Sequence, residues 1–237
     1  MELTGWLNGL KRELTAAFGD RLLFFGLQGS YGRGEATDTS DIDVVVILDR
    51  VSFADLETYR RLLDRTEHRE LVCGFVAGRA ELEGWERSDL LGLLLDTRPI
   101  VGSLEAICPP LCREDARLAV QIGACNLYHA CSHNYLHTRI PEILRGLYKS
   151  ARFVVRMRHY AGSGAYIASM RELEQAVPEP DRQLLQLCRS FPLTEETEFD
   201  RLSRILLEWA SAQLRVVSID KGRSRVCFPS GEIFIEK

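Results

Sequence analysis

The sequence predicts an α+β fold in which a small mixed β-sheet is followed by a bundle of helices. Short apolar runs bounded by glycine and polar residues dominate the first hundred residues, as is typical of buried strands. Beyond residue 113, apolar residues recur every three to four positions, as on the buried faces of helices. Prolines and glycines gather at 97–111, between the two patterns. We therefore expect two domains, at 1–108 and 109–237.

The first domain should contain three buried strands. Three apolar runs have the required length and boundaries: Leu22–Leu27, Val44–Leu48 and Leu71–Ala77. Helical spacing of apolar residues predicts helices at 3–18, 53–67 and 80–95. The segment at 97–111 is expected to be irregular, because its prolines interrupt regular structure.

The second domain should be almost purely helical. Helices are expected at about 114–138, 141–161, 165–176, 180–190 and 195–216. Alternating apolar residues in the tail predict short strands at 216–219, 225–228 and 232–235.

Two carboxylates stand at the start of the second expected strand. Side chains alternate along a strand, so Asp41 and Asp43 point the same way, with Cα atoms about 7 Å apart. Carboxylates this close on an apolar strand repel each other and lose hydration. A divalent cation would offset both costs, and hard oxygen ligands suit Mg²⁺, which takes further oxygens from water and phosphates. The pair therefore predicts an Mg²⁺ site.

The residues around this pair resemble a known signature. Gly29-Ser30, ten intervening residues and Asp41-x-Asp43 are similar to the motif of the polymerase-β-like nucleotidyltransferase superfamily. The fuller string, Gly-Ser-x-x-Arg-Gly ending in Ser-Asp-Ile-Asp, resembles its small bacterial members of the kanamycin-nucleotidyltransferase and minimal-nucleotidyltransferase types. The resemblance implies a catalytic sheet domain and a helical partner domain that hold the substrate between them.

The resemblance also implies a reaction. An enzyme of this kind transfers a nucleoside monophosphate, in the first instance AMP, from an NTP to an acceptor hydroxyl by two-metal catalysis. The first acceptor class is a small molecule such as an aminoglycoside. Two alternatives stay open: AMP transfer to a protein tyrosine, as in antitoxin-like enzymes, and a catalytically weak nucleotide-binding module.

The motif residues receive roles from this chemistry. Asp41 and Asp43 would be catalytic residues that hold the metals. Gly29 would let the backbone approach phosphate oxygens, and Ser30 would donate to them. Arg33 would bind the nucleotide and neutralise developing charge.

Two features at this site leave other interpretations open. Arg33 could instead be a surface arginine paired with Glu35 or Asp38. The family usually has a third carboxylate on the neighbouring strand, but the expected strand at 71–77 has none, and Cys73 and Gly74 stand where it might be. Glu70, at that strand's start, is the nearest candidate for this catalytic, metal-binding carboxylate, and an ordinary exposed residue is the equal alternative. Asp96 is the second candidate.

A basic arc is expected on the helix at 141–161. Four residues at steps of four, three and four share one side of it: Arg145, Lys149, Arg152 and Arg156. Like charges on one arc repel unless an anion faces them. By analogy with kanamycin-type enzymes, Lys149 would bind the triphosphate and Glu142 would act as catalytic base. The alternative is a solvated basic face paired with acids on neighbouring helices.

Two further patterns in the helical half have weaker claims. This half resembles HEPN domains, some of which are RNases, and Arg152 and His159 have a compatible spacing. A second set recurs every fourth residue and could bind zinc, although helix packing or a substrate pocket suits it better: Cys125, His129, His133 and His137.

Composition bounds the location and partners. No apolar run approaches the roughly 18 residues that span a membrane, and the start lacks the pattern of a secretion signal. The odd count of 7 cysteines favours reduced thiols in a cytoplasm. A formal net charge of −4 disfavours general nucleic-acid binding. We expect a cytoplasmic enzyme whose partners are an NTP, most of all ATP, and a hydroxyl-bearing acceptor. A homodimer is one assembly that it could form.

Overall fold

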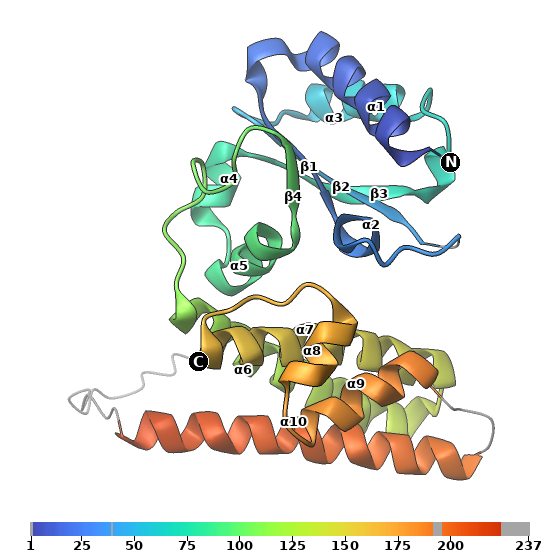
Figure 1. Ribbon diagram of the computed structural model, residues 1–237, viewed down its shortest axis with the longest axis vertical. Coiled ribbons are helices and arrows are strands. Elements are labelled where there is room, and N and C mark those ends of the chain that lie inside the picture. The colour runs from blue at the N-terminus through green and yellow to red at the C-terminus, as the bar shows by residue number, and fades with distance from the viewer. Residues whose placement is uncertain (1, 39, 192–195, 224–237) are drawn as a thin grey trace, which may run out of the picture. The chain divides into compact units, whose positions relative to one another are not determined.

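The computed structural model describes residues 2–38, 40–191 and 196–223 (Figure 1). The chain forms two compact units. Unit 1 comprises Met1–Ala119 and Arg156–Val177, and unit 2 comprises Val120–Val155 and the chain from Pro178. The α+β prediction is confirmed, because a small mixed sheet is accompanied by many helices. The domain boundary at 108/109 stays a prediction.

Unit 1 is built on a four-stranded sheet with the order β3-β2-β1-β4. Its strands are β1 (Leu22–Gln28), β2 (Ile42–Leu48), β3 (Val72–Gly78) and β4 (Arg98–Val101). Strand β1 is antiparallel to β2 and β4, whereas β2 and β3 are parallel. Strand β4 corrects the expectation of an irregular 97–111 segment. An edge strand tolerates a residue such as Pro99, because one of its sides needs no hydrogen-bond donors.

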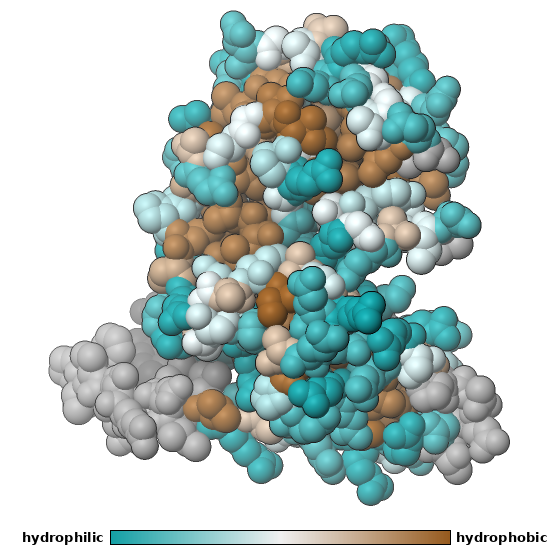
Figure 2. Space-filling model, in the orientation of Figure 1, coloured by the Kyte–Doolittle hydropathy of each residue, from teal (hydrophilic) through white to brown (hydrophobic). Residues whose placement is uncertain are grey.

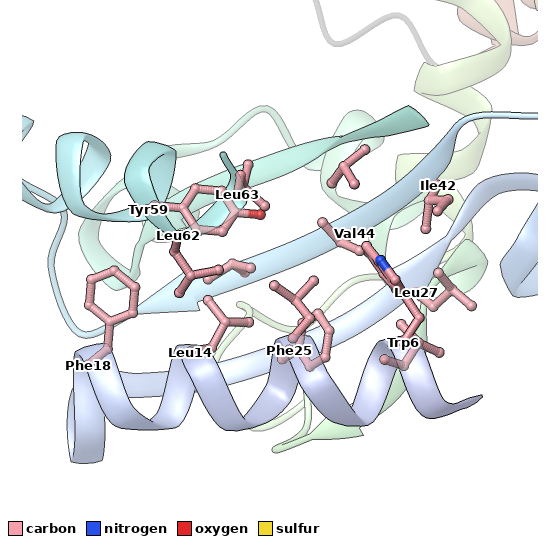
Figure 3. Packing of buried hydrophobic residues seen from close by; sticks show 14 of the residues in the cluster. Trp6, Leu14, Phe18, Phe25, Leu27, Ile42, Val44, Tyr59, Leu62 and Leu63 are labelled. Atoms are coloured by element: carbon pink, nitrogen blue, oxygen red, sulfur yellow. The ribbon is translucent and has the colours of Figure 1, made fainter. Parts of the chain in front are cut away.

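Helices cover both faces of this sheet (Figure 1). Helices α1 (Leu3–Phe18) and α3 (Phe53–Leu63) pack on one face, against Val44 and Val46 of β2. Figure 3 shows the apolar side chains of α1 directed towards the strands. Alternation along β2 turns Val45 and Ile47 to the other face. There they pack with Leu82 and Leu90 of α4 (Arg79–Gly84) and α5 (Arg87–Asp96).

Helix α3 begins at a capping box that also links it to the turn before β1. Ser52 and Asp55 exchange side-chain and backbone hydrogen bonds, which satisfies free donors of the first turn. Arg21, in the short 3₁₀ turn Gly19–Arg21, donates to both carboxylate oxygens of Asp55 at 2.8 and 3.0 Å. These hydrogen bonds, chiefly that of Arg21, hold the pKa of Asp55 well below its ordinary value.

The later helices largely follow the predicted pattern. They are α6 (Arg113–His133), a π-helical turn at Asn134–Thr138, α7 (Pro141–Ser163), α8 (Met170–Ala176), α9 (Asp181–Ser190) and α10 (Glu196–Arg223). Two further expectations about secondary structure were wrong. The helix at 80–95 is interrupted between α4 and α5, and 216–219 is helical rather than a strand. Valine and isoleucine in a helix cost only about 0.5 kcal/mol relative to alanine. Their presence at 216–219 is therefore compatible with a helix. The expected strands at 225–228 and 232–235 lie outside the described residues.

Unit 2 has its own core between α7 and α10. Leu144, Tyr148 and Ala151 of α7 are fully buried, as are Leu202 and Leu206 of α10. The Tyr148 hydroxyl donates to the backbone oxygen of Leu202 at 2.9 Å. The visible surface of this unit is mostly hydrophilic, whereas apolar residues emerge between hydrophilic ones over unit 1 (Figure 2). Within the described ranges, no helix is both long and apolar enough to cross a bilayer.

Candidate active site

The predicted carboxylates lie at the start of β2. Asp43 is the second residue of the strand, opposite Gln28 of β1 and Cys73 of β3. It is half-buried and, by alternation along the strand, lies on the same face as Val45. Asp41 immediately precedes the strand and is exposed. The structure therefore brings the two acids to one end of the central strand.

The charge around Asp43 is not balanced by the protein. Burial raises the pKa of Asp43 above its ordinary value of 3.8, the negative charge of Asp41 adds to this, and Asp96 contributes further. The positive charge of Arg33 opposes the rise but does not cancel it. A cation beside Asp43 would stabilise the ionised form of its carboxylate. The donor set thus fits a divalent metal ion bound by oxygen ligands.

The Gly29-Ser30 turn lies directly against Asp43. Gly29 opens the short helix α2 (Gly29–Arg33) with φ of +70°, a conformation that favours glycine. A Cβ atom built on Gly29 would lie 2.1 Å from Oδ2 of Asp43, far inside contact distance. Only glycine therefore lets the backbone approach the carboxylate this closely, and Ser30 follows it in α2.

Arg33 is held by two carboxylates. Its Nη1 donates to Oδ2 of Asp96 at 2.5 Å and its Nε to Oε2 of Glu35 at 3.2 Å. The Arg33 and Asp96 side chains are only 15% and 13% exposed. Both acids have a second partner, since the Tyr166 hydroxyl donates to Oδ1 of Asp96 at 2.7 Å and the Met170 amide to Oε1 of Glu35 at 2.6 Å. We call these five residues the Arg33 network.

The network bears on the role of Arg33. The structure gives it the Glu35 partner of the alternative interpretation, although in a mostly buried position. Burial, followed by the charge of Asp96, raises the pKa of Tyr166, so its hydroxyl stays protonated and donates. The sequence carried no signal for Tyr166, which is separated from Asp96 by 70 positions.

Arg156 positions the segment that brings Tyr166 to Asp96. It is 5% exposed, and its guanidinium donates to the backbone oxygens of Ile167 and Ala168 at 3.0 and 2.9 Å. The same group lies 5.7 Å from the centre of the Tyr166 ring. The expectation that Arg156 belongs to a basic arc facing an anion was wrong, and so was the alternative of a solvated face, because Arg156 is buried. Its charge is stabilised by hydrogen bonds to backbone carbonyls of the following loop.

The strand next to β2 does not provide the third carboxylate opposite Asp43. Cys73 stands opposite Asp43 on the neighbouring strand, as the sequence suggested. Glu70 lies in the 3₁₀ turn Arg69–Leu71 with its side chain 73% exposed, and its ionic neighbour is His68 at 3.9 Å. Asp96 is the further acid whose charge reaches Asp43. In the described part of the chain, no group of three His, Cys, Asp or Glu residues is placed to hold a metal ion, and the role of Glu70 stays a prediction.

An aromatic pair lies on the same face of the sheet. Phe75, two residues beyond Cys73, contacts Trp85 edge to face, with ring centres 5.0 Å apart. Trp85 is 37% exposed, and its indole nitrogen donates to Asp89 at 2.7 Å. In the continuous helix expected at 80–95, Trp85 would lie on the same side as the buried Leu82. The interruption before α5 leaves it at the surface instead.

The predicted residues of the helical half lie on α7 and α6. Glu142 and Lys149 belong to unit 2, are exposed, and are seven residues apart, which puts them on one side of α7. Their roles stay predictions. On α6 and the π-helical turn, ring centres of His133 and His137 are 4.9 Å apart. These histidines form no described three-residue metal cluster.

Arg33→Ala is expected to destabilise the protein. It would leave Asp96 and Glu35 without their cation in a mostly buried place, which costs about 2–3 kcal/mol of unfolding free energy. Urea unfolding measures this loss. Arg117→Ala is the matched control, because Arg117 pairs with Glu114 at an exposed site and should cost no more than about 0.5 kcal/mol. Equal losses in the two variants would show that the network does not stabilise unit 1.

Comparison with known proteins identifies the class. Residues 8–103 match the family model of the nucleotidyltransferase domain. This region contains the sheet, the Gly29-Ser30 turn, Asp41, Asp43 and Asp96. The chain therefore carries a nucleotidyltransferase domain of the polymerase-β-like superfamily, and the protein is an enzyme that transfers nucleotides.

One solved structure extends the likeness beyond this domain. The fold is similar to that in the crystal structure of spectinomycin adenyltransferase AAD(9) from Enterococcus faecialis with ATP and spectinomycin. The TM-score is 0.52 at 16% identity, over 86% of this chain and 98% of that chain. At this identity the likeness shows a shared fold. A comparison with curated proteins finds no match. The HEPN-like character of the helical half stays a prediction.

Proposed function

We propose that the enzyme transfers a nucleoside monophosphate, in the first instance AMP, from an NTP to a hydroxyl of a small acceptor of the aminoglycoside kind. The observation that carries this proposal is the half-buried Asp43, held next to Asp41 and against the Gly29-Ser30 turn with its charge unbalanced. The fold supports it, since the similar adenyltransferase was solved with ATP and spectinomycin.

The carboxylates define where metal ions would bind. Asp41 and Asp43 would hold a divalent cation, and their hard oxygen donors favour Mg²⁺. When bound, such an ion neutralises phosphate charge and makes an acceptor hydroxyl easier to deprotonate. Gly29 provides room beside Asp43, and Ser30 would donate its hydroxyl and amide to phosphate oxygens. Two-metal catalysis remains part of the proposal, with Glu70 as the predicted third ligand.

The choice of base follows from which acids are free. Both oxygens of Asp96 accept short hydrogen bonds, from Arg33 and Tyr166, so a proton there would disrupt the network. Asp96 is therefore better suited to positioning Arg33 than to deprotonating an acceptor. We propose Glu142 as base and Lys149 as a ligand of the triphosphate, both by analogy with kanamycin-type enzymes.

Pyrophosphate release tests the proposed reaction. The purified protein is incubated with each NTP and with Mg²⁺ or Mn²⁺, with and without spectinomycin and an aminoglycoside panel. Acceptor-dependent pyrophosphate release and a product heavier by one nucleotide support the proposal. Label transfer from ATP to a protein band in lysate would favour a protein-tyrosine acceptor. Saturable NTP binding without turnover under any condition would favour the nucleotide-binding module.

Lys149→Ala should weaken ATP binding more than AMP binding. AMP lacks the phosphates that this lysine is proposed to meet, so the expected loss is about tenfold for ATP and within about twofold for AMP. Calorimetric titrations of both nucleotides measure this difference. The exposed Lys11 of α1 supplies a matched control, Lys11→Ala, which should change neither affinity. Equal small losses for ATP and AMP would indicate that the basic side of α7 is simply solvated. The proposal of Glu142 as the base would then be withdrawn.

A further inference from the structure

A pocket lies wholly within unit 2, and none of the residues that line it is among those proposed for nucleotide transfer. It has a volume of about 290 Å³, near the lower end for small-molecule sites. One wall comes from the end of α6 and the π-helical turn, through Cys131, Tyr135 and Leu136. The other comes from α10, including Ser203 and Leu207. The lining surface is mainly apolar, although Ser132, Asp200 and Arg204 also contribute to it.

The π-helical turn shapes one wall of this pocket. Such turns are rare and occur often at functional sites. Asn134, which is buried, fixes the turn by accepting from the Thr138 hydroxyl and the Ile140 amide and by donating to the Ile140 oxygen, at 2.5, 2.9 and 3.0 Å. The two residues that follow Asn134, Tyr135 and Leu136, stay exposed at the pocket.

A buried hydroxyl group in the lining has no partner. Ser203 is 4% exposed, and its Oγ makes no hydrogen bond within the part of the chain that the structure describes. Ser132, the other serine of the lining, already donates to the Tyr128 oxygen at 2.8 Å. An unpaired buried hydroxyl destabilises the folded state, and a bound polar group would satisfy it.

The charges at the pocket leave one cation unmatched. Asp200 accepts from Arg139 at 2.8 Å, and the Arg139 guanidinium also lies over the Tyr135 and Phe199 rings. Asp200 is therefore already balanced. Arg204, in the same lining, has no ion pair with any described residue. An anionic group at the pocket would complete this arrangement.

We propose that this pocket binds a small apolar monocarboxylate, of the size of an arylpropionic or medium-chain fatty acid. Arg204 would pair with the carboxylate, and the Ser203 hydroxyl would donate to one of its oxygens. Tyr135, Leu136 and Leu207 would cover the apolar body. The proposal goes beyond nucleotide transfer and does not depend on it, because none of these residues belongs to the transfer site.

Calorimetry on the full-length protein tests the site. Indole-3-propionate, 3-phenylpropionate and octanoate are titrated, with the neutral indole-3-propionamide as a matched ligand control. We expect saturable binding of at least one acid with one ligand per chain, and about tenfold weaker binding of the amide. Absence of saturable binding for all three acids overturns the proposal, as does equal binding of the acid and its amide.

Variants assign the binding to this pocket. Arg204→Gln should weaken acid binding about tenfold without changing amide binding. Arg201→Gln is the matched control: Arg201 lies one turn earlier on α10, pairs with Glu198 and does not line the pocket. Ser203→Ala should weaken binding and yet raise the melting temperature of the free protein, because it removes an unpaired hydroxyl. Unchanged acid binding in Arg204→Gln, or equal losses in Arg204→Gln and Arg201→Gln, contradicts the assignment.

Discussion

Asp43→Asn is expected to abolish metal-dependent nucleotide transfer while the fold stays intact. The amide removes one negative charge and one good metal ligand from the Asp41–Asp43 pair, so activity should fall by about 100-fold or more. Transfer of labelled nucleotide measures activity, and circular dichroism checks the fold. Wild-type activity in this variant would contradict the proposal that Asp43 binds the metal ion.

The same variant should be more stable than the wild type in metal-free buffer at neutral pH. The pKa of Asp43 is raised by burial and by Asp41, so its ionised form is less stable in the folded than in the unfolded chain. Between about pH 3.8 and the higher folded pKa, the unfolded chain loses its proton first, and the wild type therefore loses stability as pH rises. The amide of the Asp43→Asn variant has no such proton to lose. The melting-temperature difference should vanish below pH 3.8.

Asp55→Asn is a control of opposite sign. The pKa of Asp55 is lowered, chiefly by the hydrogen bond from Arg21, so its ionised form stabilises the folded chain. This stability is present above the ordinary pKa and is lost as pH falls, so Asp55→Asn should lower the melting temperature at neutral pH. Mg²⁺ should raise the melting temperature of the wild type and of Asp55→Asn, but not of Asp43→Asn. A gain of stability in Asp55→Asn would undermine the electrostatic explanation.

Gly29→Ala is expected to have an effect on activity of similar size. The new methyl group would collide with Oδ2 of Asp43, and φ of +70° is strained for alanine. The carboxylate must move or the turn must open, so transfer should fall by about 100-fold. Gly34→Ala provides a matched control, since Gly34 has a φ of +72° but open space around its Cβ position.

The comparison of the two glycines separates backbone strain from collision. Both alanine variants should lose about 1 kcal/mol of stability from strain at positive φ. Only Gly29→Ala should also lose activity and the stabilisation by Mg²⁺. Parallel loss of activity in both variants would mean that the shape of α2, rather than the contact with Asp43, is what the reaction requires.

Local pattern was sufficient for much of unit 1. The apolar runs of β1 and β2 and the stripe of α1 are largely buried as expected, and Asp41 and Asp43 share one end of β2. The expectation that β3 is buried was only partly right, because β3 is an edge strand with exposed residues in its middle. Strand β4 was missed because Pro99 is compatible with a strand only at a sheet edge, and edge position depends on the order of the other strands.

The environment of the site depended on contacts between distant residues. The partners of Asp96 include Tyr166, which follows two long helices, and no spacing rule connects them. In the sequence, Arg156 is one of four similarly spaced basic residues on α7. It is the one of these four that is buried, because the loop after α7 packs over it. Every residue type has a backbone oxygen, so the sequence of the loop does not reveal that it accepts these hydrogen bonds.

The return of residues 156–177 to unit 1 has a consequence for synthesis and for gene rearrangement. Asp96 and Glu35 reach their last partners, Tyr166 and Met170, only after most of unit 2's first two helices has been translated. A nascent chain stopped at residue 108 would hold both acids and Arg33 without the segment that covers them. The sheet unit therefore completes late on the ribosome. A gene recombination that exchanged only residues 1–108 would likewise transfer an incomplete unit 1, without residues 156–177.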